Sequence, residues 1–165
     1  MAAETLTATR AASTFPVFKA TGAGIVCAAY GTYEVLANVE DGDIFEMCKI
    51  PAGSTIIGGY VYGDDLDTGT EALDIDIGWA DNGGSGTYDG HADAAFGLGN
   101  LGVWTGDVTT DVKPEVGNHF PLGGMLRNGD LPTFTADTTI QLEANTAANS
   151  FAAGAVSVVV FYVVD

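Results

Sequence analysis

The stretch IPAGSTIIGGYVYGDD, residues Ile50 to Asp65, holds most of the signals that decide the fold. Pro51–Gly53 forms a corner that ends one strand, because proline and glycine favour turns over strand interiors. The apolar run from Ile56 to Tyr62 is typical of the next strand. Gly58 and Gly59 inside that run indicate a β-bulge or the close approach of another backbone.

Short strands recur on both sides of this stretch. The expected strands share apolar alternation or β-branched runs bounded by turn residues: Gly24–Tyr30, Tyr33–Val39, Asp43–Ile50, Glu71–Trp79, Thr138–Ala144 and Gly154–Val164. Gly31 and Thr32 predict a tight hairpin between the first two strands. The last strand is nearly all apolar, which indicates a central strand buried on both faces or placed at an interface.

Alternation also assigns faces within two strands. It places Phe45 and Met47 opposite Cys48 and Ile50, and it places Leu73, Ile75, Ile77 and Trp79 together on one face. No useful stretch repeats apolar residues at helical spacing. Seven to nine strands with short turns predict an all-β fold, an antiparallel β-sandwich with the jelly roll as its favoured form. The expected organisation is an extended N-terminal arm over residues 1–21 and a single β-sandwich domain over residues 22–165, with a short helix as the alternative for the first segment.

Composition excludes several partners. The 165 residues carry 22 acidic and 5 basic side chains, for a net charge of −17. Such a surface repels phosphate, so direct binding to nucleic acid or to anionic membrane headgroups is not expected. No signal peptide is visible, and the apolar run Ala155–Val164 is too short to cross a bilayer as a helix. We therefore expect a soluble protein made in the cytoplasm. Cys27 and Cys48 lie in apolar stretches, where buried free thiols are common, although spacing leaves a disulfide open.

Catalytic patterns are weak throughout. Gly97–Gly102 matches GxGxxG but lacks the preceding strand and following helix of a dinucleotide site. His91 and His119 stand alone, without metal-ligand or nucleophile-elbow spacing. The acids Asp64, Asp65, Asp67 and Glu71 resemble a calcium loop without matching the EF-hand pattern, and a solvated turn is the competing interpretation. We therefore predict no enzyme activity, no metal and no cofactor.

The middle of the chain is rich in glycine and aromatic residues. Ala80–Gly102 predicts a long loop that is functional or packed by a neighbour. The aromatic residues around it are Tyr60, Tyr62, Trp79, Tyr88, Phe96 and Trp104. They suit either the core and rim of a sandwich or anchors of a protein–protein contact.

The segment CKIPAGSTIIGGYVYGDDLDTGTEALDIDIGWADNGG, with the later TTIQLEA and AGAVSVVVFYVV, resembles small structural proteins of tailed bacteriophages. The resemblance runs from about Phe45 to Asp165 and rests on turns and alternation. It implies a β-sandwich or jelly-roll virion component of the capsid decoration (cement) type, without enzyme activity. Such a protein would sit on the outer capsid surface as a homotrimer and stabilise the phage head by bridging neighbouring major capsid subunits.

On this hypothesis, contact residues can be assigned. Capsid contacts are expected from the arm at Phe15, Pro16, Val17 and Phe18, and intersubunit contacts from Tyr60, Tyr62, Trp79 and Trp104. Two alternatives remain open: another virion component such as a neck, tail or fibre-base protein, or a carbohydrate-binding β-sandwich module.

Overall fold

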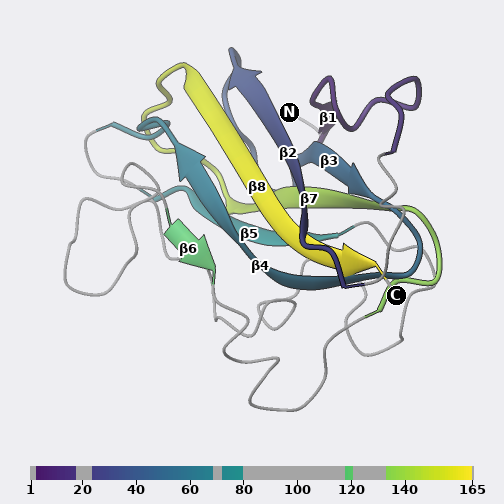
Figure 1. Cartoon of the computed structure of the whole chain (residues 1–165). Coiled ribbons are helices and arrows are strands. Elements are labelled where there is room, and N and C mark those ends of the chain that lie inside the picture. Colours follow the sequence, from purple (N-terminus) through teal and green to yellow (C-terminus); the bar gives the residue numbers. More distant parts are fainter. Residues whose placement is uncertain (1–2, 18–23, 69–71, 80–117, 121–132, 165) are drawn as a thin grey trace.

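The chain folds into strands arranged as two layers. The computed structural model describes residues 3–17, 24–68, 72–79, 118–120 and 133–164 (Figure 1). The strands in these ranges are β1 (Thr5–Thr7), β2 (Cys27–Val35), β3 (Ile44–Ile50), β4 (Ser54–Gly63), β5 (Asp74–Trp79), β6 (Asn118–Phe120), β7 (Thr138–Thr146) and β8 (Gly154–Val164). No helix that could span a membrane occurs in this part of the chain.

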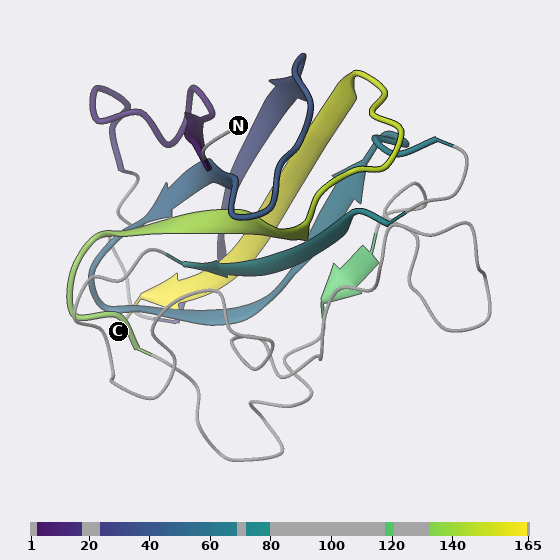
Figure 2. The ribbon, with the colours of Figure 1, turned by 180° about the vertical axis from the view of Figure 1, so that it is seen from behind.

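Each layer is a four-stranded sheet. Sheet A has the order β1-β3-β7-β5 and sheet B the order β2-β8-β4-β6. All neighbouring strands are antiparallel except β1 and β3, which run parallel. In Figure 1, β2, β8 and β4 lie in front of β7 and β5, and the reverse view in Figure 2 brings β7 and β5 forward. The predicted all-β sandwich is therefore confirmed.

The core lies between the two sheets because every long strand turns one apolar face inward. Sheet A contributes Phe45 and Leu142, and sheet B contributes Val158 and Val160, all fully buried. Trp79 packs edge-on against Phe134, with ring centroids 5.1 Å apart. Burial of these apolar side chains is the main stabilising term of such a fold.

Glycines act differently in β2 and β4. The hairpin predicted at Gly31-Thr32 is wrong, because β2 runs through both residues as one strand that pairs with β8 from Cys27 to Val35. Gly31 is needed because β3 crosses closely: a Cβ there would lie 1.8 Å from the carbonyl oxygen of Met47. In β4, by contrast, the register shifts between Ile56 and Gly58, which confirms the predicted bulge.

Strand β3 departs from simple alternation. Its register against β7 shifts between Glu46 and Cys48. Phe45 is buried before the shift, Met47 within it, and Cys48 and Ile50 after it. The predicted opposition of these pairs is therefore wrong, since one extra residue in a bulge returns the following side chains to the core face.

The N-terminal segment differs from the expected extended arm over residues 3–17. Thr5–Thr7 form β1 at the edge of sheet A. The carboxylate of Asp43, itself buried, accepts a hydrogen bond from the Glu4 N–H at 2.8 Å. Ala8 and Ala11 are also buried, so this segment packs on its own sandwich.

Candidate interaction surface

The outer face of sheet B is the most distinctive surface of the described chain. Alternate residues of β2, β8 and β4 point away from the core and meet side by side. We call them the sheet-B face: Ala28, Tyr30, Thr32, Tyr60, Tyr62, Ser157, Val159 and Phe161. None of the eight is charged, and five are aromatic or aliphatic beyond alanine.

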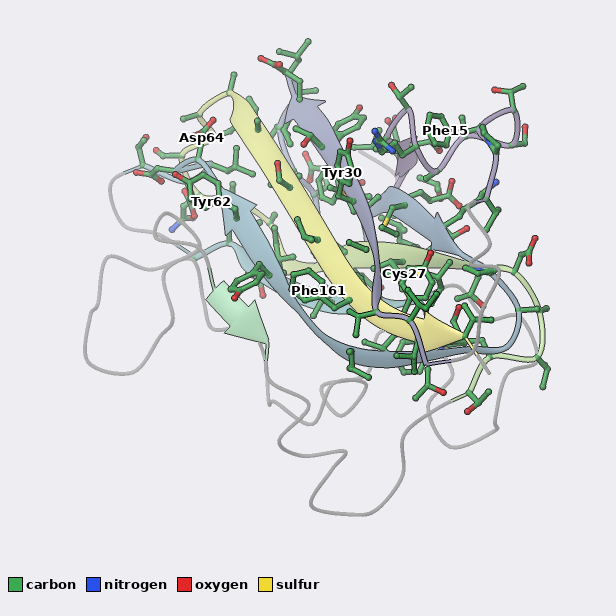
Figure 3. The ribbon with its side chains drawn as sticks, viewed as in Figure 1. Phe15, Cys27, Tyr30, Tyr62, Asp64 and Phe161 are labelled. Atoms are coloured by element: carbon green, nitrogen blue, oxygen red, sulfur yellow. The ribbon has the colours of Figure 1, made fainter. Side chains whose placement is uncertain are left out.

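Strand register fixes how these side chains meet. Val159 pairs with Tyr30 on one side and Tyr60 on the other, which makes a row across three strands. Tyr30, Tyr60 and Tyr62 are 48%, 43% and 52% exposed. Phe161 meets Tyr60 edge-on, with centroids 5.8 Å apart. Figure 3 shows Tyr62 toward one end of β4 and Phe161 farther along β8. The result is a broad aromatic patch that solvent reaches.

Polar groups lie within and at one end of the sheet-B face. The hydroxyls of Thr32 and Ser157 are 2.8 Å apart and hydrogen-bonded. The next row along the strands brings acids, with Glu34 on β2 and Asp64 just after β4. The Asp64 carboxylate accepts the Ala155 N–H at 2.9 Å. Apolar contact is therefore available in the middle, and negative charge at this end.

A cation flanks the patch at β2. The Arg10 guanidinium lies 3.7 Å from the centroid of the Tyr30 ring and 5.0 Å from that of Phe15. Arg10 also donates a hydrogen bond to the Tyr30 hydroxyl. Such stacking holds the N-terminal segment beside the sheet-B face, because a cation is attracted to the faces of aromatic rings. Figure 3 shows Phe15 on that segment, next to the strand that carries Tyr30.

The outer face of sheet A is different in chemistry. Glu46 accepts a hydrogen bond from the Thr7 hydroxyl at 2.9 Å, and Lys49 donates to the Ala12 carbonyl at 3.2 Å. Gln141 and Glu143 lie on the same face, from β7. This alternation of a buried and a polar face is usual for antiparallel sheets. On sheet B the outward side chains of the three long strands are instead mostly aromatic or aliphatic, with Thr32 and Ser157 as the polar members of the sheet-B face.

The acidic turn after β4 is an internal clamp. Asp67 is fully buried, and its carboxylate accepts the N–H groups of Ala72, Leu73, Asn149 and Ser150 at 2.6, 3.0, 3.1 and 2.7 Å. Burial raises the pKa of this carboxyl, but the four N–H donors outweigh burial and hold the pKa below its ordinary value.

Backbone hydrogen bonds already occupy the carboxylate oxygens of this turn that a metal ion would need as ligands. The oxygens of Asp67 already have four partners, and those of Asp64 and Asp65 accept backbone N–H groups as well. No group of three or more metal-ligating side chains occurs among the described residues. Glu71, the fourth acid of the predicted calcium loop, lies outside them. The turn therefore functions in the structure as a hydrogen-bond acceptor for backbone groups.

The other predicted site residues fall in three places. Trp79 is 1% exposed and belongs to the core, so its assignment to an intersubunit contact is wrong. Pro16 is exposed and Val17 half-buried, beside Phe15. Phe18 and Trp104, with His91, Gly97–Gly102 and the loop Ala80–Gly102, lie outside the described residues, as does the His119 side chain. Cys27 and Cys48 are buried free thiols.

The sequence prediction missed Tyr30, Val159 and Phe161. All three were assigned to strands, but an unbroken apolar run does not show which face is covered. A usable signal did exist in β8, because its outward positions include the bulky apolar residues Val159, Phe161 and Val163. In a sheet covered on one side only, that composition points to a second contact surface.

An all-β sandwich of this kind also occurs in solved structures of phage heads. A chain of the Ralstonia phage GP4 capsid matches with a TM-score of 0.67 and 17% identity over 98% of both chains. A chain of the cyanophage Pam1 capsid asymmetric unit matches with a TM-score of 0.58 and 22% identity, over 93% of this chain and 94% of that one.

A third likeness is to the acid-stable capsid of the Helicobacter pylori bacteriophage KHP30. It has a TM-score of 0.54 and 10% identity, over 87% of this chain and 90% of that one. No family model matches the chain, and no curated protein matches it either. At these identities the likeness establishes a shared fold over nearly the whole length.

Proposed function

We propose that this chain is a structural protein of a phage head, of the capsid decoration (cement) type. The sheet-B face is the observation that carries the proposal: a broad, uncharged aromatic surface on a chain of net charge −17. Large exposed apolar patches on folded proteins mark interaction sites. The fold shared with chains of three phage capsids supports a shell as the partner.

The proposed activity is mechanical. The protein binds the outside of the shell and bridges neighbouring major capsid subunits, so separating the subunits requires breaking its contacts as well. The charge supports the outer surface over the lumen, since −17 repels packaged nucleic acid. No chemistry, metal or cofactor is part of this mechanism.

Two surfaces are assigned in the proposal. Tyr60 and Tyr62 make intersubunit contacts within a homotrimer, because closed symmetry lets the same patch be covered in every copy. Phe15, Pro16 and Val17 contact the capsid from the N-terminal segment. The strand orders support the jelly-roll form, since each connection from β2 to β8 leads from one sheet to the other.

The test uses expanded empty heads and separated tails from the same phage. Cosedimentation with heads but not with tails supports decoration, and binding to tails alone would assign the chain to another part of the virion. Tyr62→Ser should weaken binding to heads or break the trimer, while Thr139→Ala on sheet A should do neither. Deleting Met1–Thr21 should abolish head binding; full binding by that variant would refute the role of the N-terminal segment.

A carbohydrate-binding module is the second candidate. Tyr60 and Tyr62 favour it, because exposed rings on a flat sheet face offer stacking surfaces with hydroxyl groups. Calorimetric titration with glycans separates the two: saturable heat that Tyr62→Ser removes would support sugar binding and displace the capsid proposal.

A further inference from the structure

A pocket lies at the end of β2, apart from the Tyr and Phe side chains of the sheet-B face. It has a volume of about 190 Å³ and is bounded by β1, the end of β2 and the connection from β2 to β3. Its apolar wall includes Leu6 and the fully buried Val35 and Val39. A cavity of roughly 150 Å³ holds a molecule as large as benzene. The pocket is therefore large enough for one side chain of a partner.

The rim of this pocket is acidic. Of the eleven described residues that line it, four are acids, against 22 of 165 in the whole chain: Glu4, Glu34, Glu40 and Asp43. Among the residues that the structure describes, no Lys, Arg or His lines it. The Asp43 carboxylate is already used, since it accepts the N–H groups of Glu4 and Glu40 at 2.8 Å each. Glu4, Glu34 and Glu40 therefore set the charge that an incoming group meets, and the Glu40 carboxylate also accepts a hydrogen bond from the Asn38 side-chain amide at 3.0 Å.

We infer that the pocket receives a lysine or arginine side chain from a neighbouring protein subunit. Both side chains combine an apolar stem with a cationic end, which matches an apolar wall under an acidic rim. A neutral apolar side chain would desolvate Glu34 and Glu40 without compensation, and an anionic group would be repelled. Charge complementarity thus selects the occupant.

The position of the pocket favours a protein as the source of that side chain. Glu34 belongs to the pocket and also follows Tyr30 and Thr32 along the outward side of β2. The separation of Tyr30 from Glu34 is about 13 Å at the usual rise of a strand. Leu36, 74% exposed, stands at the rim and offers apolar contact to the residues that flank the cation. A protein subunit that lies beside the sheet-B face can therefore fill the pocket.

The pocket is tested first on the whole isolated chain, without any capsid. Amide NMR spectra are recorded during titration with n-butylguanidinium chloride and, in parallel, with n-butanol. Saturable shifts at Val35, Ala37 and Val39 with the cation alone are expected. Equal shifts with both compounds would show a merely apolar pocket, and absence of local shifts would show none; either result overturns the inference.

Variants connect the pocket to a partner. Glu34→Gln with Glu40→Gln keeps the side-chain shapes and should weaken n-butylguanidinium binding roughly fivefold, as expected for two exposed charge pairs. Asp41→Asn is the matched control, since Asp41 is exposed beside the pocket without lining it. Ala37→Leu should obstruct the pocket and block the cation while the circular dichroism spectrum stays unchanged.

The identity of the subunit rests on the proposed function, so heads are tested separately. The double variant should bind expanded empty heads roughly fivefold more weakly than the native chain, with a smaller dependence on salt. If the native chain binds n-butylguanidinium but not heads, the decoration proposal fails and the cation pocket stands. If heads bind native chain and double variant equally, the inferred role of the pocket in docking is overturned.

Discussion

Replacing Asp67 with asparagine should destabilise the fold far more than the same replacement at Asp64 or Asp65, the other described aspartates of this turn. The carboxylate joins the connection after β4 to the connection before β8, through Ala72 and Leu73 on one side and Asn149 and Ser150 on the other. Asparagine has nearly the same shape, so the substitution removes acceptor capacity and charge without creating a cavity.

The magnitude follows from the hydrogen bonds. One carboxylate oxygen accepts three N–H groups and the other accepts that of Ser150. An amide keeps one acceptor oxygen and turns an NH₂ group toward the remaining donors. A hydrogen bond to a charged group contributes about 1.5–3 kcal/mol, and an unsatisfied buried donor costs about 1–3 kcal/mol. We expect a loss of about 2–4 kcal/mol, which lowers Tm by about 5–15 °C in a chain of this size.

The dependence on pH has a defined sign. The pKa of Asp67 in the folded chain lies below its ordinary 3.8. The folded state therefore binds the proton more weakly than the unfolded state, and the stabilisation is complete above about pH 3.8 and is lost as pH falls through the lower, folded value. The difference between native chain and Asp67→Asn should be constant from pH 5 to 7 and shrink below pH 4.

Urea unfolding at several pH values measures this difference. Asp65→Asn is the control, since it removes the same charge from the same turn, where Asp65 accepts a single backbone N–H. Comparing variants at each pH cancels the titration of the other acids. The clamp would be refuted if Asp67→Asn and Asp65→Asn unfolded at the same urea concentration, or if the Asp67→Asn difference stayed unchanged at pH 3.

Three further outcomes are expected. Gly31→Ala should cost about 1–3 kcal/mol or more in urea unfolding, because its Cβ would collide with the Met47 carbonyl, whereas Thr32→Ala on the exposed side should change little; equal stability of the two would contradict the close crossing. Burial raises the pKa of the Cys48 thiol to about 12, and nearby Arg10 lowers it only slightly, so mass spectrometry should find Cys48 unmodified by iodoacetamide at pH 8 until the chain is unfolded. Rapid labelling of the folded chain would refute that burial. Tyr60→Ser and Tyr62→Ser should leave the monomer's unfolding midpoint within about 0.5 kcal/mol while reducing assembly, measured by sedimentation velocity, since both side chains lie on an exposed face.

The sequence predicts most strands because their alternation reflects burial on one face. The bounds of β8 agree with the expectation of Gly154–Val164, and the glycine pair in β4 marks a true bulge. Gly31 shows where such reasoning fails. A glycine beside a threonine suits a hairpin or a close crossing equally well, and only the distant Met47 carbonyl decides between them. That contact joins β2 to β3 and leaves no local pattern.

The candidate surface was predictable in part. Tyr60 and Tyr62 are exposed as their assignment to a contact requires, but Trp79 is a core residue. Alternation had already placed Trp79 with Leu73 and Ile75, so strand phase was a better guide than aromatic character. The pocket at the end of β2 could not be predicted, because β1 approaches it from the start of the chain through a parallel pairing with β3.

The dependence of binding on salt concentration distinguishes contact through the sheet-B face from binding of a cation in the pocket at the end of β2. Contact through Tyr30, Tyr60 and Phe161 buries apolar area, which salt does not screen, and screening of the −17 charge eases the approach of further copies. Binding of a cationic side chain between Glu34 and Glu40 weakens as salt rises, because both acids are near solvent. Self-association that grows with salt, together with head binding that declines with it, would therefore assign the sheet-B face to contacts between copies and the pocket to the shell. The opposite pair of trends would exchange these assignments.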